Sequence, residues 1–204
     1  MRRLYLASLG LLALAGCPDR KISEVNPQQD KEEFKDIPVQ LNRDLDILFV
    51  IDNSGSMEEE QTSLAQNFPL FIERLERIEV GLPNIPMGVV SSDTGAGPFN
   101  ISMCSGTGDN GQLQTTPQVS GCSPPTGAFI SDIKNTDGTR ETNYTGTLAD
   151  TFSCIAQLGI TGCGFEQHLE SMRRALKRSN NFNNGFLRDN AYLAVIFIAD
   201  EDNW

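Results

Sequence analysis

Two kinds of hydrophobic pattern alternate along the chain. Continuous apolar runs rich in β-branched residues occupy 46–51 and 191–198, and a shorter run occupies 87–91. Runs of this kind are typical of strands that are buried on both faces of a parallel sheet. A fourth run, at 128–131, predicts a strand at the edge of the same sheet.

Between these runs, apolar residues recur at helical spacing. The first helical face comprises Leu64, Phe68, Phe71, Ile72 and Leu75. The second comprises Leu148, Phe152, Ile155 and Leu158, and the third Phe165, Leu169, Met172 and Leu176. Pro69 lies inside the first of these helices and is expected to bend or interrupt it. Strands that alternate with helices predict an α/β fold with a mainly parallel sheet.

The first 16 residues have a different pattern. Arg2 and Arg3 precede an apolar run that is too short to cross a bilayer, which needs roughly 20 apolar residues. A charged start followed by a short apolar stretch predicts an export signal over 1–16. Residues 14–17 read Leu-Ala-Gly-Cys, which resembles the lipobox of bacterial lipoproteins. That resemblance implies cleavage before Cys17 and a diacylglyceryl group on its sulfur; the alternative is a plain secretory signal followed by an early cysteine.

Residues 17–44 are polar and lack sustained periodicity, so they are predicted to form a tether between the lipid and the folded domain. Without 1–16 the chain has 14 basic and 27 acidic residues, a net charge of −13 against −11 for the full chain. This charge argues against a nucleic-acid partner, because the phosphate backbone would be repelled. We therefore expect a lipid-anchored protein of the bacterial cell envelope, either periplasmic or surface-exposed.

Cysteine usage supports export. The chain has five cysteines, and assigning Cys17 to the lipid leaves an even number in an oxidising compartment. Three pairings are possible, and we expect the sequence neighbours to pair, as Cys104–Cys122 and Cys154–Cys163. The spacing contains no Cys-x-x-Cys pair, which excludes a zinc site of that type.

Candidate chemistry follows the two outer apolar runs. The run at 46–51 leads into Asp52, Ser54 and Ser56, and the run at 191–198 leads into Asp200. Ligands of open parallel sheets bind beyond the carboxyl ends of the strands. If these two strands are neighbours, the four side chains surround one point. Oxygen-only ligands suit a hard cation such as Mg²⁺ or Ca²⁺, and suit zinc poorly.

The sequence DILFVIDNSGSM, a hydrophobic strand followed by Asp52-x-Ser54-x-Ser56, resembles the metal-ion-dependent adhesion site of von Willebrand factor type A domains. The resemblance covers roughly 45–204 and implies a Rossmann-like three-layer sandwich. It also implies that both serines bind the metal directly and that Asp52 acts largely through water. Asp200 matches the family's later Asp by position. The family continues past this point, so the resemblance implies a domain truncated at its C-terminus with an exposed strand edge.

The family's threonine ligand has no clear counterpart. Thr161 is the nearest threonine, but aligning Leu169 with the family's apolar helical face puts Cys163 or Gly164 at the ligand position. Glu166 is a further candidate to replace the hydroxyl. Replacing this hydroxyl by water or a carboxylate is expected to weaken binding or to favour Ca²⁺.

Three other features bear on the site. Asp93 follows the strand predicted at 87–91, and so is expected on the same face as a residue behind the ligands. His168, the single histidine, is expected to have a surface or capping role. The segment 92–147 is too long and too rich in Gly, Ser, Thr and Asn for a simple connection, and we expect this insertion to lie beside the metal and to shape the choice of partner.

These features favour a membrane-anchored module that binds a carboxylate-bearing protein ligand through Mg²⁺, Ca²⁺ or Mn²⁺. In such a site, neutral hydroxyls leave much of the ion's charge for an acidic group of the partner. The alternatives are a structural envelope lipoprotein whose metal only stabilises the fold, and a metal-assisted hydrolase with a serine nucleophile. A base near Ser54 is missing from the sequence pattern, which counts against the hydrolase.

Overall fold

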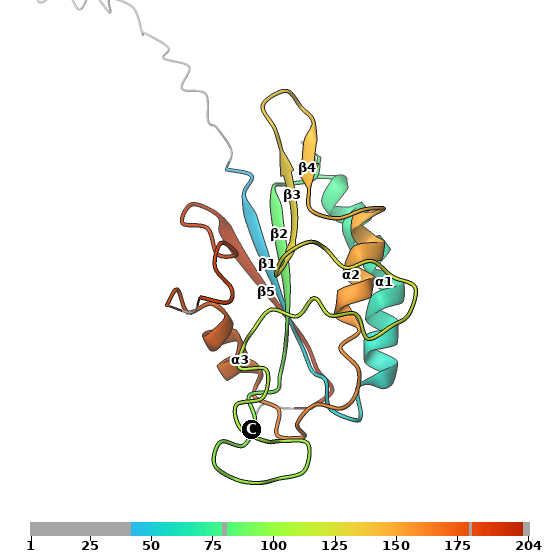
Figure 1. Ribbon diagram of the computed structural model, residues 1–204. Helices are drawn as coiled ribbons and strands as arrows, with labels where there is room; N and C mark the ends of the chain where they lie inside the picture. Colours follow the sequence, from blue (N-terminus) through green and yellow to red (C-terminus); the bar gives the residue numbers. More distant parts are fainter. Residues whose placement is uncertain (1–41, 79–80, 180, 202–204) are drawn as a thin grey trace, which may run out of the picture. The chain divides into compact units, whose positions relative to one another are not determined.

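The computed structural model describes residues 42–78, 81–179 and 181–201. They form an α/β fold with five strands and three helices (Figure 1). The strands are β1 (Leu45–Ile51), β2 (Ile85–Ser91), β3 (Ile130–Lys134), β4 (Arg140–Thr142) and β5 (Tyr192–Ile198). The helices are α1 (Glu58–Glu76), α2 (Leu148–Ala156) and α3 (His168–Ala175). The predicted signal 1–16, the lipidation site Cys17 and all but the last residues of the tether lie outside the described residues.

The sheet has the order β4-β3-β2-β1-β5 and is parallel at its centre. β1 pairs in parallel with β2 on one side and with β5 on the other, so the first and last strands of the chain are neighbours. This confirms the predicted parallel arrangement for the three central apolar runs. β3 and β4 add antiparallel pairs, and β4 rather than the run near 130 forms that edge. The expected edge strand was therefore placed one position too far out, because the hairpin partner β4 is too short and polar to give a pattern.

Both faces of β1 are buried. Ile47, Phe49 and Ile51 pack with α1 and α2, whereas Leu48 and Val50 pack on the side of α3. Figure 1 shows α1 and α2 on one side of the sheet and α3 on the other. The uninterrupted apolar pattern of 47–51 in β1 thus has the cause that was inferred from it, since alternate residues have different helices to pack against.

α1 runs straight through Pro69. A proline cannot donate to the carbonyl four residues earlier, which here belongs to Ala65. The hydroxyl of Ser153 on α2 donates to that oxygen instead, at 3.0 Å. The ring of Phe68 stacks on Phe152 with centroids 3.6 Å apart. Packing against α2 therefore supplies a donor for the Ala65 carbonyl in place of the N–H that Pro69 lacks. The expected interruption of the helix does not occur.

The prediction for α3 is wrong about which face of the helix is buried. Phe165 and Leu169 are about half exposed, at 49% and 54%, whereas His168, Ser171 and Ala175 are buried. Only Met172 and Leu176 of the predicted face pack against the core. The helix turns a small and polar face inward because it crosses the polar end of the sheet: the hydroxyl of Ser171 donates to the carbonyl of Ser91 at the end of β2.

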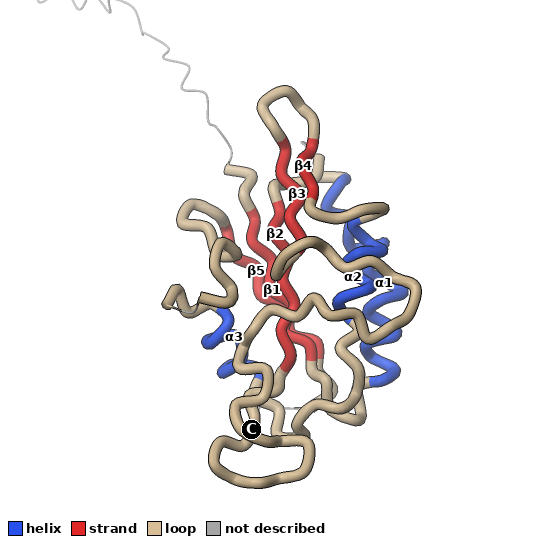
Figure 2. The backbone as a smooth tube through the Cα atoms, in the orientation of Figure 1, coloured by secondary structure: helices blue, strands red, loops and turns tan. Residues whose placement is uncertain are grey.

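The predicted disulfides are wrong in their partners. The structure joins Cys104 to Cys163 and Cys122 to Cys154. The loop between β2 and β3, the long tan segment of Figure 2, passes from the α3 side, where Leu113 is buried, to α2 on the other side. Each of its cysteines therefore meets the segment 148–163, and not the other cysteine of the same loop.

β5 forms the second edge of the described sheet. Its large side chains are partly in solvent, with Tyr192 66% exposed and Phe197 42% exposed. No helix in the part of the chain that the structure describes is long and apolar enough to cross a membrane.

Candidate cation site

The site is built where β1, β2 and β5 end. The backbone N–H of Asp52 donates to the carbonyl of Ile198, the last residue of β5, at 2.9 Å. Asp200 follows two residues later and is exposed. The ends of β1 and β5 are therefore adjacent, as the predicted ligand set required. Asp52 is the buried residue at this point, and Asp200 is the exposed one.

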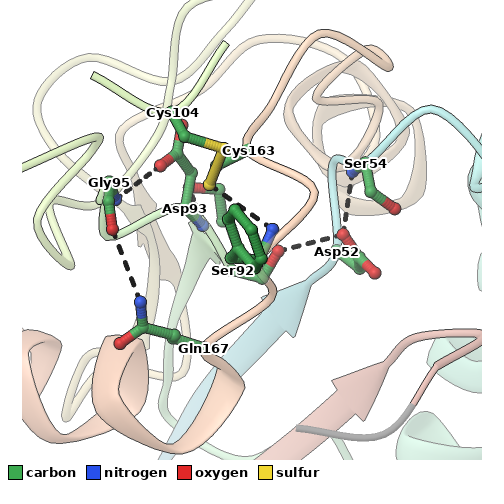
Figure 3. Close-up of a disulfide and its surroundings, with 10 residues drawn as sticks. Asp52, Ser54, Ser92, Asp93, Gly95, Cys104, Cys163 and Gln167 are labelled. Carbon is green, nitrogen blue, oxygen red and sulfur yellow. Dashed lines mark hydrogen bonds between the residues drawn. A yellow bond between two sulfur atoms is a disulfide. The ribbon is translucent and has the colours of Figure 1, made fainter. Parts of the chain in front are cut away.

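The carboxylate of Asp52 is fully buried and uses only one of its oxygens. Oδ1 accepts hydrogen bonds from the Ser54 amide at 2.8 Å and from the Ser92 hydroxyl at 2.9 Å (Figure 3). Oδ2 is buried without a hydrogen-bond partner. Burial disfavours the ionised form, but the nearby His168 and the hydrogen bonds from Ser54 and Ser92 outweigh it and lower the pKa of Asp52. Asp52 is thus a preoriented carboxylate whose Oδ2 has no hydrogen-bond partner and lies within ion-pair distance of Nε2 of His168, at 3.7 Å.

The two serines of the motif present their hydroxyls together. Ser54 is buried and Ser56 is exposed, and their Oγ atoms lie 3.2 Å apart. The turn that carries them closes with a hydrogen bond from the Met57 amide to the Ser54 carbonyl, directly before α1. Alternate residues of this turn therefore point their hydroxyls to one side, as the spacing predicted.

Gln61 of α1 holds the loop after α2 against the end of β1. Its amide nitrogen donates to the carbonyls of Asp52 at 2.7 Å and Gly159 at 3.0 Å, and its amide oxygen accepts from the Gly159 N–H. Farther along the loop, the Gly162 N–H donates to the Asn53 carbonyl. Thr161, between these two anchors, is exposed. The loop reaches the site, and other residues beyond Thr161 interact with Asp52.

Those other residues are Glu166 and His168. Glu166 is 1% exposed and His168 4% exposed, and Oε2 of the first and Nε2 of the second are buried without hydrogen-bond partners. Burial raises the pKa of Glu166, and the nearby carboxylates of Asp52 and Glu201 raise it further. The expected surface or capping role of His168 is wrong, because this side chain faces the interior of the site. The spacing of His168, Ser171 and Ala175 could have indicated a small and polar buried face.

Asp93 lies behind the site and shapes its neighbouring loop. One of its carboxylate oxygens accepts from the Gly95 amide at 2.8 Å (Figure 3). Burial raises the pKa of Asp93, and the neighbouring Asp109 adds to the rise. Its described contacts are with Ser91, with the insertion and with the backbone of Cys163 rather than with Asp52, which gives it a local structural role.

The Cys104–Cys163 disulfide lies beside these residues (Figure 3). It joins the insertion to the loop that carries Glu166 and His168. The backbone N–H of Gln167 donates to the Ser92 carbonyl, and its side-chain amide donates to the Gly95 carbonyl at 3.4 Å. The expectation that the insertion lies beside the site agrees with these contacts.

The side chains of this site could bind a cation only if serine hydroxyls are among the ligands. Within 42–78, 81–179 and 181–201, no group of three or more His, Cys, Asp or Glu side chains is arranged to hold a metal ion. The paired hydroxyls of Ser54 and Ser56, with the unpartnered Oδ2 of Asp52, give oxygen donors without such a group. A buried polar atom without a partner is costly, and a cation is one way to satisfy it.

Comparison of the chain with known protein families, with curated proteins and with solved structures found no match. The functional argument therefore depends on the residues of the site themselves.

Proposed function

We propose that the protein is a cation-dependent binding module that captures an acidic group of a protein partner. Asp52, Ser54 and Ser56 would hold the ion, with Asp200 across the strand ends and Thr161 on the neighbouring loop as further donors. The proposal extends to the fold, a Rossmann-like three-layer sandwich of the von Willebrand factor A type. The single observation that carries it is the buried Oδ2 of Asp52, which has no hydrogen-bond partner, in the same turn as two serine hydroxyls 3.2 Å apart.

The chemistry of these donors favours binding over turnover. A divalent ion held by two neutral hydroxyls and one carboxylate keeps net positive charge, and an anionic group of the partner can complete its coordination. This attraction is local, whereas repulsion between the acidic chain and an acidic partner is screened beyond about 8 Å at physiological ionic strength. A carboxylate can therefore bind to a chain with a net charge of −11.

The proposed setting is the bacterial cell envelope. Lipid on Cys17 would anchor the chain, and 17–44 would place the module away from the membrane surface. Acyl chains supply about 0.8 kcal/mol of membrane affinity per buried methylene group. The proposal for the anchor is tested by mass spectrometry of the processed protein and of a Cys17→Ser variant, in which the added lipid mass should be absent.

The cation is tested by titrating the purified full chain with Mg²⁺, Mn²⁺ and Ca²⁺ in a calorimeter. The Asp52→Ala variant should lose binding, whereas Asp137→Asn, which removes an exposed carboxylate from the β3–β4 turn, should retain it. Ser54→Ala should weaken binding without unfolding the chain. Equal binding by the wild type and by the Asp52→Ala variant would refute the site.

Partner chemistry is tested with acetate as a model carboxylate. Acetate that replaces water on protein-bound Mn²⁺ should lower the relaxation rate of water protons, and acetamide should not. An Asp52→Ala variant that unfolds, instead of losing acetate binding with its fold intact, would favour a purely stabilising metal. Ester hydrolysis that disappears with Ser54→Ala would favour the hydrolase.

A further inference from the structure

His168 and Asp52 face each other across the centre of the site. Nε2 of His168 lies 3.7 Å from Oδ2 of Asp52, and both side chains are almost fully buried. Neither atom has a hydrogen-bond partner. A buried polar atom without a hydrogen-bond partner is costly, so two that face each other need a physical explanation.

The separation is too long for a good hydrogen bond. It is an ion-pair distance for a protonated imidazole, and it also fits two ligands of one ion. Metal–nitrogen and metal–oxygen bonds of transition ions are about 2.1 Å, so two ligands on one ion lie roughly 3.0–4.2 Å apart, depending on the angle between them. The distance of 3.7 Å between His168 and Asp52 lies in this range. The distance of 3.2 Å between the hydroxyls of Ser54 and Ser56 lies in it too.

The backbone holds His168 in place. It is the first residue of α3, and the preceding Gln167 amide donates to the Ser92 carbonyl at 3.1 Å. One turn later, the Ser171 hydroxyl donates to the Ser91 carbonyl. The start of α3 is therefore fixed to the end of β2, while Ser92 itself donates to Asp52. The imidazole and the carboxylate are positioned by the same short segment.

We infer that Nε2 of His168 is a ligand of the ion, in contrast to the family's all-oxygen pattern, and that the site favours ions that accept nitrogen. This inference rests on the proposed cation site. Imidazole suits Mn²⁺, Co²⁺ and Zn²⁺ better than Mg²⁺ or Ca²⁺, which prefer oxygen alone. His168 also supplies the donor that the sequence lacks at the family's threonine position.

The chain has one histidine, which makes the experiment direct. The full chain, prepared without a histidine tag, is loaded with Mn²⁺ and measured by pulsed electron paramagnetic resonance. We expect a hyperfine coupling from an imidazole nitrogen. Selective ¹⁵N-labelling of histidine should change that coupling, and since the chain holds no second histidine the signal assigns to His168.

Affinity provides the second measurement. His168→Gln should lower Mn²⁺ affinity by about tenfold or more and change Mg²⁺ affinity less, so that the ratio of the two falls. Mn²⁺ bound without imidazole coupling, or a His168→Gln variant with an unchanged ratio, would overturn the role of His168 and leave the cation site in place. Absence of Mn²⁺, Mg²⁺ and Ca²⁺ binding by the wild type would overturn both.

Discussion

The disulfide between Cys104 and Cys163 joins the insertion after β2 to the loop that carries Glu166 and His168. Both cysteines are buried, at 3% and 0% exposure. Cys163 follows directly after Gly162, whose backbone N–H donates to the carbonyl of Asn53, the residue between Asp52 and Ser54. The second disulfide, Cys122–Cys154, ties the same insertion to α2. The two bridges therefore form a natural pair for comparison.

Removing either bridge by alanine substitution of both cysteines should lower the free energy of unfolding by similar amounts. The bridged residues are 59 and 32 apart, and the closure entropy of such loops corresponds to about 4 kcal/mol in each case. Cation affinity should separate them: the Cys104/Cys163 variant should bind Mn²⁺ about tenfold more weakly, because the loop of His168 loses its tie. Equal affinities in the two variants, measured by calorimetry, would contradict a positioning role for this bridge.

Gly162 approaches the site too closely for any side chain. A Cβ at this position would lie 2.1 Å from Oδ1 of Asn53. Gly162→Ala should therefore displace Asn53 or the loop, lowering the free energy of unfolding by about 1–3 kcal/mol and weakening cation binding. Gly164→Ala is the matched control, because its nearest neighbour would be a Glu166 oxygen at 4.0 Å. Denaturant unfolding and metal titration of both variants check this, and equal behaviour would exclude the close contact.

Ser153 compensates for Pro69 by donating to the Ala65 carbonyl. Ser153→Ala should lower the free energy of unfolding by about 1 kcal/mol. In a Pro69→Ala background the same change should cost less, because the substituted residue would restore a backbone N–H donor for that carbonyl. Ser63→Ala, at an exposed position of α1, is the control and should be close to neutral. Additive effects of the Ser153 and Pro69 changes would show that the two do not share the carbonyl.

Glu170 contributes stability that depends on pH. Hydrogen bonds and charge from Arg173 and Arg174 lower the pKa of Glu170 from 4.5 to about 2. Because the folded-state pKa is depressed, the contribution is complete above pH 4.5 and disappears as the pH falls toward 2. Glu170→Gln should therefore be less stable than the wild type at about pH 7, with the difference smaller at about pH 3. A difference in urea unfolding that stays constant over this range would contradict the ion-pair explanation.

The central strands could be predicted because their cause is local. β1 is apolar at consecutive positions since each face of it is covered by helices, and the polar motif begins where the strand ends. α1 and α2 follow the predicted apolar faces for the same reason. The predicted break at Pro69 did not occur, because Ser153 donates to the Ala65 carbonyl. A local pattern could not show this, since Ser153 is 88 residues from Ala65 in the chain.

The site shows the same division. Asp52, Ser54 and Ser56 belong to one turn, so their spacing alone placed two hydroxyls together. His168 reaches Asp52 only because α3 docks across the end of β2 through Gln167 and Ser171. The helical pattern around His168 predicted an apolar buried face that included Phe165 and Leu169. In the fold these two side chains are exposed.

The sequence by itself thus determined the central strands, the α/β class and the hydroxyl-rich turn after β1, because hydrophobic periodicity and short motifs record what each residue meets within a few positions. The tertiary structure alone decided the order of the strands, the partners of the four described cysteines and the burial of His168. Those depend on contacts between residues far apart in the chain, such as Cys104 with Cys163, and no local pattern encodes which of several chemically equivalent partners the packed chain brings together.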